Sequence, residues 1–241
     1  MPSPSSDVVE RHPHLSSPLP SGWVRVDMHS HTMFSGDSTT TLEETAEAVL
    51  AAGLDVLCIT DHNAIEGARR LREVLGHDSP CRVVAGEEVR THTGEIIGLF
   101  LTERIPFGSA AAVTARAITD QGGVVYVPHP FDPMRANITE ASLDDIVSAG
   151  LVAAIEAVNA KTSLQSLNDR ARRYGEQHGL ALGAGSDAHV PDALGAAYVE
   201  MPDFDGPTDF VAKLREGRTV GHHWDRPRPW SPRIVPSVSS D

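Results

Sequence analysis

The sequence predicts an α/β fold, and specifically a β/α barrel. Apolar runs of strand length alternate with helix-like stretches at steps of about thirty residues, which is the pattern of βαβ units in a mostly parallel sheet. Polar residues follow strand after strand at its carboxyl end, and in a closed barrel those ends share one face. A doubly wound open sheet is the competing architecture. It would spread the same ends along a line, and no Gly-rich dinucleotide turn follows the first strand.

The expected strands and helices alternate along most of the chain. Strands are predicted at residues 23–28, 54–60, 82–85, 95–101, 124–127, 153–158 and 180–184, with a short further strand near Tyr198. Helices are predicted over about 41–52, 65–75, 110–119, 143–148, 163–178 and 208–214. The first helix begins with a capping box at Thr41 and Glu44, and Gly53 stands where a helix-ending glycine belongs. Only a short turn separates the third and fourth strands, so these two are expected to form a hairpin.

The chain length and composition favour one domain, which we place at residues 23–223. Residues 1–22 are rich in Pro and Ser and are predicted to be a disordered arm, whereas the proline-rich residues 224–241 are predicted to be an irregular tail. The arm lacks the basic start and apolar stretch of a secretory signal, so a cytoplasmic location is expected. Cys58 and Cys81 are expected to be buried free thiols.

The charge and hydropathy exclude two classes of partner. The formal net charge of -13 argues against a protein that binds long nucleic acids, because a basic surface supplies most of that affinity. No apolar run is long enough to span a membrane. The sequence leaves the oligomeric state open.

Two histidines one residue apart, His29 and His31, close the first predicted strand. Side chains alternate faces along a strand, so these two imidazoles point the same way and can bind one metal ion. Further candidate donors stand just after, or at the edge of, later strands: Asp37, His62, Glu88, Glu95, His129, Asp187 and His189. Histidine and carboxylate donors without cysteine suit Zn²⁺, Mn²⁺ or Fe²⁺, whereas a set of oxygens alone would have suggested Mg²⁺ or Ca²⁺.

The motifs occur in an order that resembles the PHP (polymerase and histidinol phosphatase) family, in its stand-alone metal-dependent phosphoesterase branch. They are Asp27-Met28-His29-Ser30-His31-Thr32, Ser35-Gly36-Asp37, Ile59-Thr60-Asp61-His62-Asn63, Gly86-Glu87-Glu88, Pro128-His129-Pro130 and Gly185-Ser186-Asp187-Ala188-His189. The resemblance covers about residues 24–221. It implies a distorted seven-stranded β/α (TIM-like) barrel that holds two or three divalent metals and hydrolyses phosphate esters. Residues 208–221 resemble the small closing segment of stand-alone members.

The resemblance also implies a set of ligands. His29 and His31 would hold the first ion, with Asp187 as a further ligand. Asp37, His62 and His189 would hold the second ion. Glu88, rather than Glu87, matches the bridging carboxylate and would share the third ion with His129 and Glu95, the last of which stands where the family usually has histidine.

The hypothesis for the mechanism is in-line attack on phosphorus by a hydroxide that bridges two close metal ions. We assign catalytic roles to Glu88, His189 and Asp61, although Asp61 could instead orient a ligating imidazole. Arg135 and Lys161 stand after strand ends and are predicted to bind the phosphate of the substrate.

The preferred substrate is a phosphomonoester of a small metabolite or nucleotide. One alternative is a phosphodiesterase or exonuclease that acts on short nucleotides. An amidohydrolase is a second alternative, but that chemistry generally requires a lysine ligand in a middle strand, and no lysine precedes Lys161. A metal-stabilised module that only binds a ligand is the third, and the nearly complete ligand set disfavours it.

Overall fold

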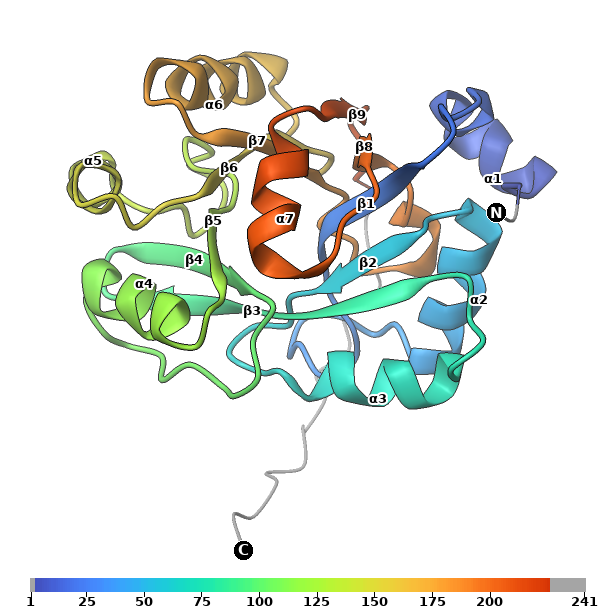
Figure 1. Cartoon of the computed structure of the whole chain (residues 1–241), viewed down its shortest axis with the longest axis horizontal. Helices are drawn as coiled ribbons and strands as arrows, with labels where there is room; N and C mark the ends of the chain where they lie inside the picture. Colours follow the sequence, from blue (N-terminus) through green and yellow to red (C-terminus); the bar gives the residue numbers. More distant parts are fainter. Residues whose placement is uncertain (1–2, 226–241) are drawn as a thin grey trace, which may run out of the picture.

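The fold is a nearly closed barrel built on one mixed sheet of nine strands (Figure 1). The computed structural model describes residues 3–225. Its strands are β1 (Trp23–Ser30), β2 (Val56–Ile59), β3 (Arg82–Thr91), β4 (Gly94–Leu99), β5 (Val124–Val127), β6 (Ala154–Asn159), β7 (Ala181–Gly185), β8 (Ala197–Pro202) and β9 (Arg218–Gly221). Their order in the sheet is β7-β6-β5-β4-β3-β2-β1-β8-β9. The first seven are the strands of the predicted barrel, β8 is the short strand predicted near Tyr198, and β9 lies in the closing segment.

The strand pairing explains how the barrel closes. Neighbours are parallel from β1 to β3 and from β5 to β7, and β4 runs antiparallel to both of its neighbours, so the predicted β3–β4 hairpin is confirmed. β8 pairs antiparallel with the first half of β1. The end of β1 instead meets the chain after β7, where the His31 N–H donates to Ala188 and the Asp187 N–H donates to His29, at 2.9 and 2.8 Å. These bonds bring the first and last barrel strands together at their carboxyl ends.

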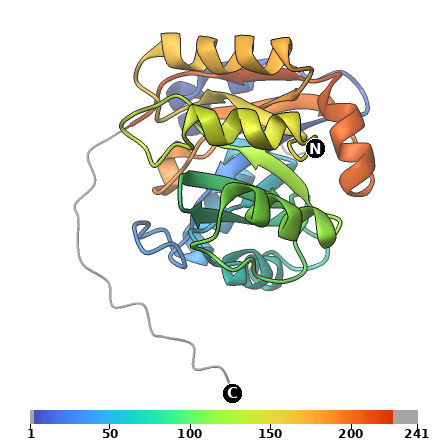
Figure 2. The same cartoon turned by 90° about the vertical axis from the view of Figure 1, so that its left-hand side faces the viewer.

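Helices cover the outside of the sheet, as Figure 2 shows from a second side. They are α2 (Leu42–Ala52), α3 (Glu66–Leu75), α4 (Ala111–Asp120), α5 (Glu140–Ser148) and α6 (Gln165–Gln177). The predicted capping box forms at the start of α2, with the Thr41 hydroxyl accepting from the Glu44 N–H. Gly53 ends the helix in the left-handed region, at φ 63°. Among residues 3–225, none of the helices combines the length and the apolar character that a membrane span requires.

The remaining helix, α7 (Gly206–Leu214), closes one mouth of the barrel (Figure 1). Phe210 and Leu214 are fully buried in the core cluster that fills the barrel, together with Val24 and Tyr126. Phe100 follows the antiparallel strand β4 and packs its ring on Phe210, with centroids 5.1 Å apart. That contact places α7 where the parallel strands begin, so the opposite mouth, at their carboxyl ends, is left for a site.

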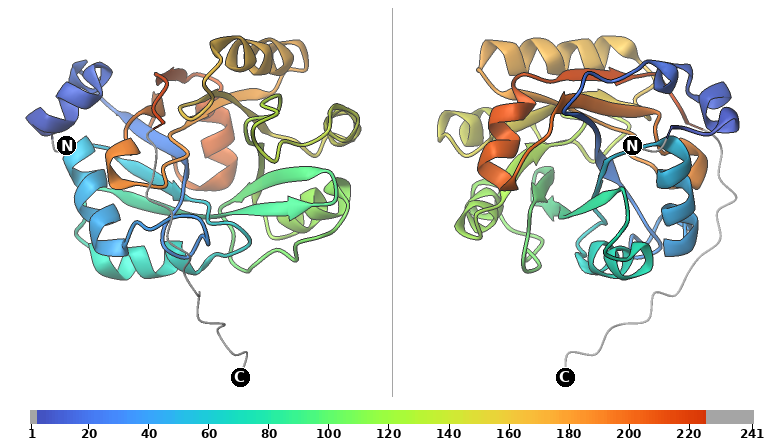
Figure 3. Two further views of the ribbon diagram at one scale, coloured as in Figure 1. Left: turned by 180° about the vertical axis from the view of Figure 1, so that it is seen from behind. Right: turned by 45° about the vertical axis from the view of Figure 1, so that its right-hand side comes forward.

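We predicted a disordered arm at residues 1–22, but its described part, residues 3–22, contains helical turns that pack on the domain. Residues 3–22 hold α1 (Ser6–Arg11) and a 3-10 helix at Pro13–Ser16, which lie beside α2 in Figures 1 and 3. Val8 and Leu15 are buried in the outer core cluster, and the Ser5 N–H donates to Ala51 at 2.8 Å. These few apolar residues anchor a segment whose Pro and Ser content indicated disorder. Cys58 and Cys81 are buried free thiols, as predicted, and the predicted tail lies outside the described residues from 226 onward.

Candidate metal centre

The structure brings all nine predicted metal ligands together at the mouth of the barrel where the parallel strands end. Their donor atoms form four overlapping groups, and within each group every donor lies within 4.8 Å of the others. The groups are His29, His31 and Asp187; His31, Asp37, His62 and His189; His29, Glu88 and His129; and His62, Glu88 and Glu95. Residues far apart in the sequence therefore converge on one small volume, as a closed barrel requires.

The first group lies deepest and is fully enclosed. Nε2 of His29 lies 3.1 Å from Nε2 of His31, and Oδ1 of Asp187 lies 3.8 and 3.4 Å from these two nitrogens. All three side chains are at most 3% exposed. Lone pairs so close together repel one another unless a proton or a metal ion lies between them, and Zn²⁺ or Mn²⁺ would accept this mixture of imidazole and carboxylate. The donor set thus fits a divalent ion.

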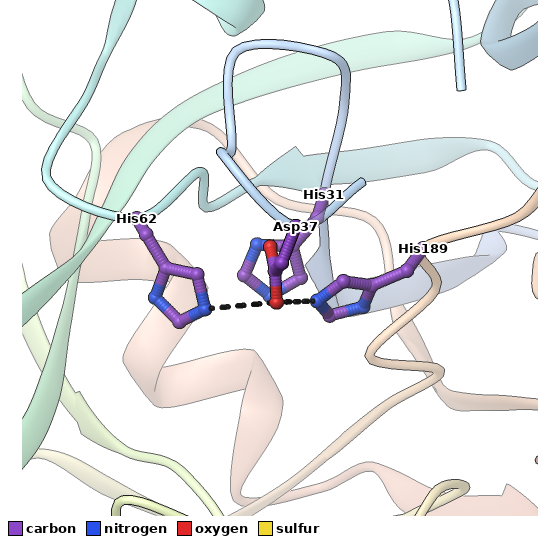
Figure 4. Close-up of side chains that lie close together, drawn as sticks. All are labelled: His31, Asp37, His62 and His189. Atoms are coloured by element: carbon purple, nitrogen blue, oxygen red, sulfur yellow. Dashed lines mark hydrogen bonds and ion pairs between the residues drawn. The ribbon is translucent and has the colours of Figure 1, made fainter. Parts of the chain in front are cut away.

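The second group surrounds Asp37, which Figure 4 shows between His62 and His189 with His31 behind it. Oδ2 of Asp37 lies 2.8 Å from Nε2 of His189 and 3.7 Å from Nε2 of His62. Ser35 supports the group, because its hydroxyl contacts Nδ1 of His31 at 2.9 Å and accepts from the His62 N–H at 3.0 Å. This serine was not predicted, although it stands in the Ser-Gly-Asp motif.

Glu88 occupies the centre of the cluster. Its Oε2 lies 3.3 Å from the nearest nitrogens of His29, His31 and His62, and its Oε1 lies 3.1 Å from Nε2 of His129. Glu87 points to the other side of β3, where it accepts from the Ile105 N–H at 2.8 Å. The geometry therefore supports the choice of Glu88 over Glu87 as the shared carboxylate.

Glu95 completes the fourth group from the edge of the site. Its Oε1 lies 3.7 Å from Nδ1 of His62 and 3.2 Å from the guanidinium of Arg90. Arg90 was not predicted. It is more than half exposed, so solvent weakens its ion pair with Glu95, although that pair still competes with an ion for the carboxylate.

Most carboxylates of the cluster are ionised and lie beside imidazoles, which is an arrangement that suits bound cations. Burial raises the pKa of Glu88, but the imidazoles of His29 and His62 outweigh it and hold that pKa well below its usual value. Burial likewise lowers the pKa of His62, but the carboxylates of Glu88 and Asp37 raise it to about 9. Without an ion, protonated imidazoles therefore neutralise the carboxylates. Divalent ions would replace those protons, because a ligating imidazole must be neutral.

Arg135 and Lys161 reach the centre from the loops after β5 and β6. Arg135 forms an ion pair with Asp187, and Nζ of Lys161 lies 3.5 Å from Asp187 and 3.0 Å from Nδ1 of His189. Both cations hold the pKa of Asp187 well below its usual range, against the opposing effect of burial. A cavity of about 250 Å³ opens beside Arg135, and its lining includes Arg90 and Met134 besides seven of the candidate ligands.

Asp61 does not line this cavity, in contrast to its assignment as a catalytic residue. It is fully buried, and its two oxygens accept from the Thr32 N–H at 2.6 Å and the Thr32 hydroxyl at 2.8 Å. These contacts hold the loop that follows His31. These contacts favour the alternative in which Asp61 positions a neighbouring part of the site, and its catalytic role stays a prediction.

A barrel of this kind is the fold of PHP-like metal-dependent phosphoesterases. The family model of the PHP domain matches residues 27–161, more than half of the chain, and the PHP-associated family model matches residues 165–219. The chain belongs to the PHP domain family, as its motifs indicated.

Two curated proteins of Methanocaldococcus jannaschii are similar in sequence. MJ0417 is 29% identical over 201 residues, which cover 80% of this chain and 79% of that protein. MJ1587 is 36% identical over 121 residues, or 46% of this chain and 70% of that protein.

Solved structures share the fold at lower sequence identity. A two-domain protein from Bacteroides vulgatus, described as containing a predicted PHP-like metal-dependent phosphoesterase, aligns with a TM-score of 0.69 and 17% identity over 86% of this chain and 68% of its own. The lesion-specific endonuclease PfuEndoQ from Pyrococcus furiosus aligns with a TM-score of 0.63 and 14% identity over 82% of this chain and 57% of its own.

Proposed function

We propose that this protein hydrolyses phosphomonoesters of small metabolites or nucleotides with two or three divalent ions, Zn²⁺, Mn²⁺ or Fe²⁺. The observation that carries the proposal is the convergence of nine histidine and carboxylate donors beside two cations, Arg135 and Lys161, at one mouth of the barrel. His29, His31 and Asp187 would hold the first ion, and Asp37, His62 and His189 the second. Glu88 would bridge them and share a third ion with His129 and Glu95.

The residues around the ions supply substrate binding. Bound ions would provide an activated water and neutralise the charge on the phosphoryl group. Arg135 and Lys161, now paired with Asp187, are placed to exchange that carboxylate for phosphate oxygens once an ion takes over Asp187. During hydrolysis the water oxygen bonds to phosphorus as the bond to the leaving group breaks. Met134, at 86% exposure on the rim, is placed to contact the organic part of the substrate.

The size of the cavity and the net charge of the protein favour a small substrate over a nucleic acid. The cavity holds about 250 Å³, and the formal net charge is -13, which repels a long polyanion. Phosphodiester cleavage is the second candidate, because the similar fold of PfuEndoQ belongs to an endonuclease. A cytoplasmic location remains part of the proposal.

The test is an activity screen of apo-protein reloaded with Zn²⁺, Mn²⁺ or Fe²⁺. The substrates are p-nitrophenyl phosphate, its bis-ester, sugar phosphates and mononucleotides. We expect inorganic phosphate from the monoesters and little turnover of the bis-ester. Preferential cleavage of the bis-ester would replace this proposal with the diesterase, and no turnover with any metal would indicate a binding module.

Matched variants separate the roles of the residues. Glu88→Ala should lower kcat/KM by at least about 100-fold, because it removes a carboxylate shared among several ligands. Glu87→Gln, a buried neighbour that faces away from the cavity, should leave it within about threefold. Lys161→Ala and Arg135→Ala should raise KM more than they lower metal content. Near-normal metal content and turnover in Glu88→Ala would reject the arrangement.

A further inference from the structure

Glu156, on β6, is fully buried beneath the metal centre and belongs to none of its four groups of donors. Both of its oxygens face that centre. Oε1 lies 3.1 Å from Nδ1 of His29, and Oε2 accepts from the backbone N–H of His129 at 2.8 Å. The side-chain amide of Asn159 donates to the same Oε2 at 2.9 Å and contacts Oδ2 of Asp187 at 3.2 Å. One carboxylate is thus tied to three candidate ligands from three different strand ends.

We propose that Glu156 is the positioning residue of the metal centre: it fixes the tautomer of His29 and locks the ligands after β5 and β7 to the end of β1. The two nitrogens of the His29 imidazole have different partners. Nε2 is the nitrogen that faces His31 and Glu88, so it must be free of a proton to bind an ion. The proton then belongs on Nδ1, where Oε1 of Glu156 accepts it. A carboxylate on the far nitrogen also makes the imidazole a better donor to the metal.

The second oxygen extends the same control to two further ligands. His129 has a strained backbone, with φ at 28°, and such a conformation persists only where surrounding contacts hold it. The bond from its N–H to Oε2 of Glu156 is such a contact. Asn159 connects Oε2 to Asp187, another ligand in a positive-φ conformation, at 50°. Glu156 therefore sets the relative positions of donors that would bind different ions.

The contacts also show that Glu156 is not itself a ligand. Its Oε1 lies against the nitrogen of His29 that faces away from the other donors, and its Oε2 already accepts two hydrogen bonds. Both oxygens are therefore used in holding other residues. The inference concerns metal binding alone, so it is tested without substrate and can fail or succeed independently of the phosphomonoesterase proposal.

The substitution Glu156→Gln replaces one of the two accepting oxygens of the side chain by an NH₂ group and hardly changes the volume of the side chain. A glutamine whose oxygen faces His29 must direct its NH₂ at the N–H of His129 and the amide of Asn159, which are themselves donors. The flipped glutamine loses His29 instead. In the first case the N–H of His129 and the amide of Asn159 lose their hydrogen-bond acceptor, and in the second case the N–H at Nδ1 of His29 loses its acceptor. Each outcome leaves a buried N–H group without a hydrogen bond. The matched control is Glu87→Gln, at an equally buried glutamate whose bond to the Ile105 N–H lies outside the centre.

The experiment measures the Zn²⁺ affinity of the full-length protein by competition with a chromophoric chelator, and the visible spectrum of the Co²⁺-loaded form. We expect Glu156→Gln to weaken Zn²⁺ binding by about 10–100-fold and to change the Co²⁺ bands. Glu87→Gln should retain the affinity within threefold and the parent spectrum. Parent-like affinity and spectrum in Glu156→Gln, or an equal loss in both variants, would overturn the proposal.

A second variant covers the case in which Glu156→Gln does not fold. Glu156→Asp keeps the buried charge but withdraws the carboxylate by one methylene, so it no longer reaches Nδ1 of His29. Its circular dichroism should match that of the parent, whereas its Zn²⁺ affinity should fall at least fivefold. An Asp variant that folds and binds Zn²⁺ as tightly as the parent would also refute the positioning role.

Discussion

Gly185 is the residue where the closure of the barrel and the metal centre depend on the same few atoms. It ends β7, and a methyl group added there would lie 2.3 Å from Cβ of His29, 2.8 Å from its backbone nitrogen and 2.9 Å from Oε1 of Glu156. Ordinary carbon–carbon contacts are about 3.5–4.0 Å, so Gly185→Ala requires β1 and β7 to separate by about 1 Å. The backbone of Gly185 has no positive φ, so any effect of the substitution is steric.

The size of the effect follows from that displacement. Overpacking a core typically costs about 1–3 kcal/mol. In a domain of this size, about 2 kcal/mol lowers the unfolding temperature by about 4–8 °C. His29 carries the displacement directly into the ligand cluster, so we also expect weaker Zn²⁺ binding. Differential scanning calorimetry of the apo-protein measures the unfolding temperature, and competition with a chelator measures the Zn²⁺ affinity.

Gly36→Ala is the control, because no atom lies within 4 Å of the added methyl group and the residue stands beside Asp37 in the same site. It should unfold within about 1 °C of the parent. An unchanged unfolding temperature and unchanged Zn²⁺ affinity in Gly185→Ala would show that β1 and β7 do not pack as described. The reasoning about closure would then be refuted.

Two further predictions follow from the edge of the site and from the amino-terminal arm. Glu95→Gln should lower the number of bound ions by one while the remaining ions stay bound, because Glu95 belongs only to the fourth group of donors. The number of ions per chain is measured by plasma mass spectrometry of dialysed protein, and an unchanged number would contradict the prediction. His12 is fully buried, and burial lowers its pKa to about 4, so the folded state keeps it neutral where the unfolded state binds a proton. Its contribution to stability is complete above about pH 6.5 and is lost as the pH falls toward 4, by up to about 3 kcal/mol. Urea unfolding at pH 7.5 and pH 5 should therefore show a smaller loss of stability for His12→Gln than for the parent, and equal losses would reject this role.

The sequence predicted the parts of the molecule in which local pattern and tertiary structure agree. The run at 54–60 is apolar on both faces because β2 lies between β1 and β3 inside the barrel wall. Most of the ligands could be predicted because they stand at or after the carboxyl end of a strand, and closing the sheet brings those ends together whatever their distance in sequence. Glu95 instead stands at the start of β4, which runs antiparallel to its neighbours and therefore begins at the same mouth.

Single tertiary contacts explain the features that the sequence did not predict. The arm was predicted to be disordered because Pro and Ser outnumber its apolar residues, yet Val8 and Leu15 find a buried place against α2, which composition does not report. Asp61 stands next to His62 in the sequence, but neighbours at a strand end point in opposite directions, so one reaches the cavity and the other the Thr32 loop. Arg90 lies two residues beyond Glu88 on β3, and only the register of the hairpin, which pairs it with Glu95, brings it to the rim.

The same strand register places a positive charge at the edge of the site. Arg90 and Glu95 are directly paired on neighbouring antiparallel strands, so the carboxylate that would complete a third ion always has a cation beside it. Glu88, in contrast, is surrounded by imidazole nitrogens that would bind the same ions. An ion at Glu88 is therefore favoured by the whole cluster, whereas an ion at Glu95 competes with an existing ion pair. We thus expect the ions to bind in sequence, with the position at Glu95 filled last, and a Zn²⁺ titration followed by calorimetry should resolve it as the weakest step.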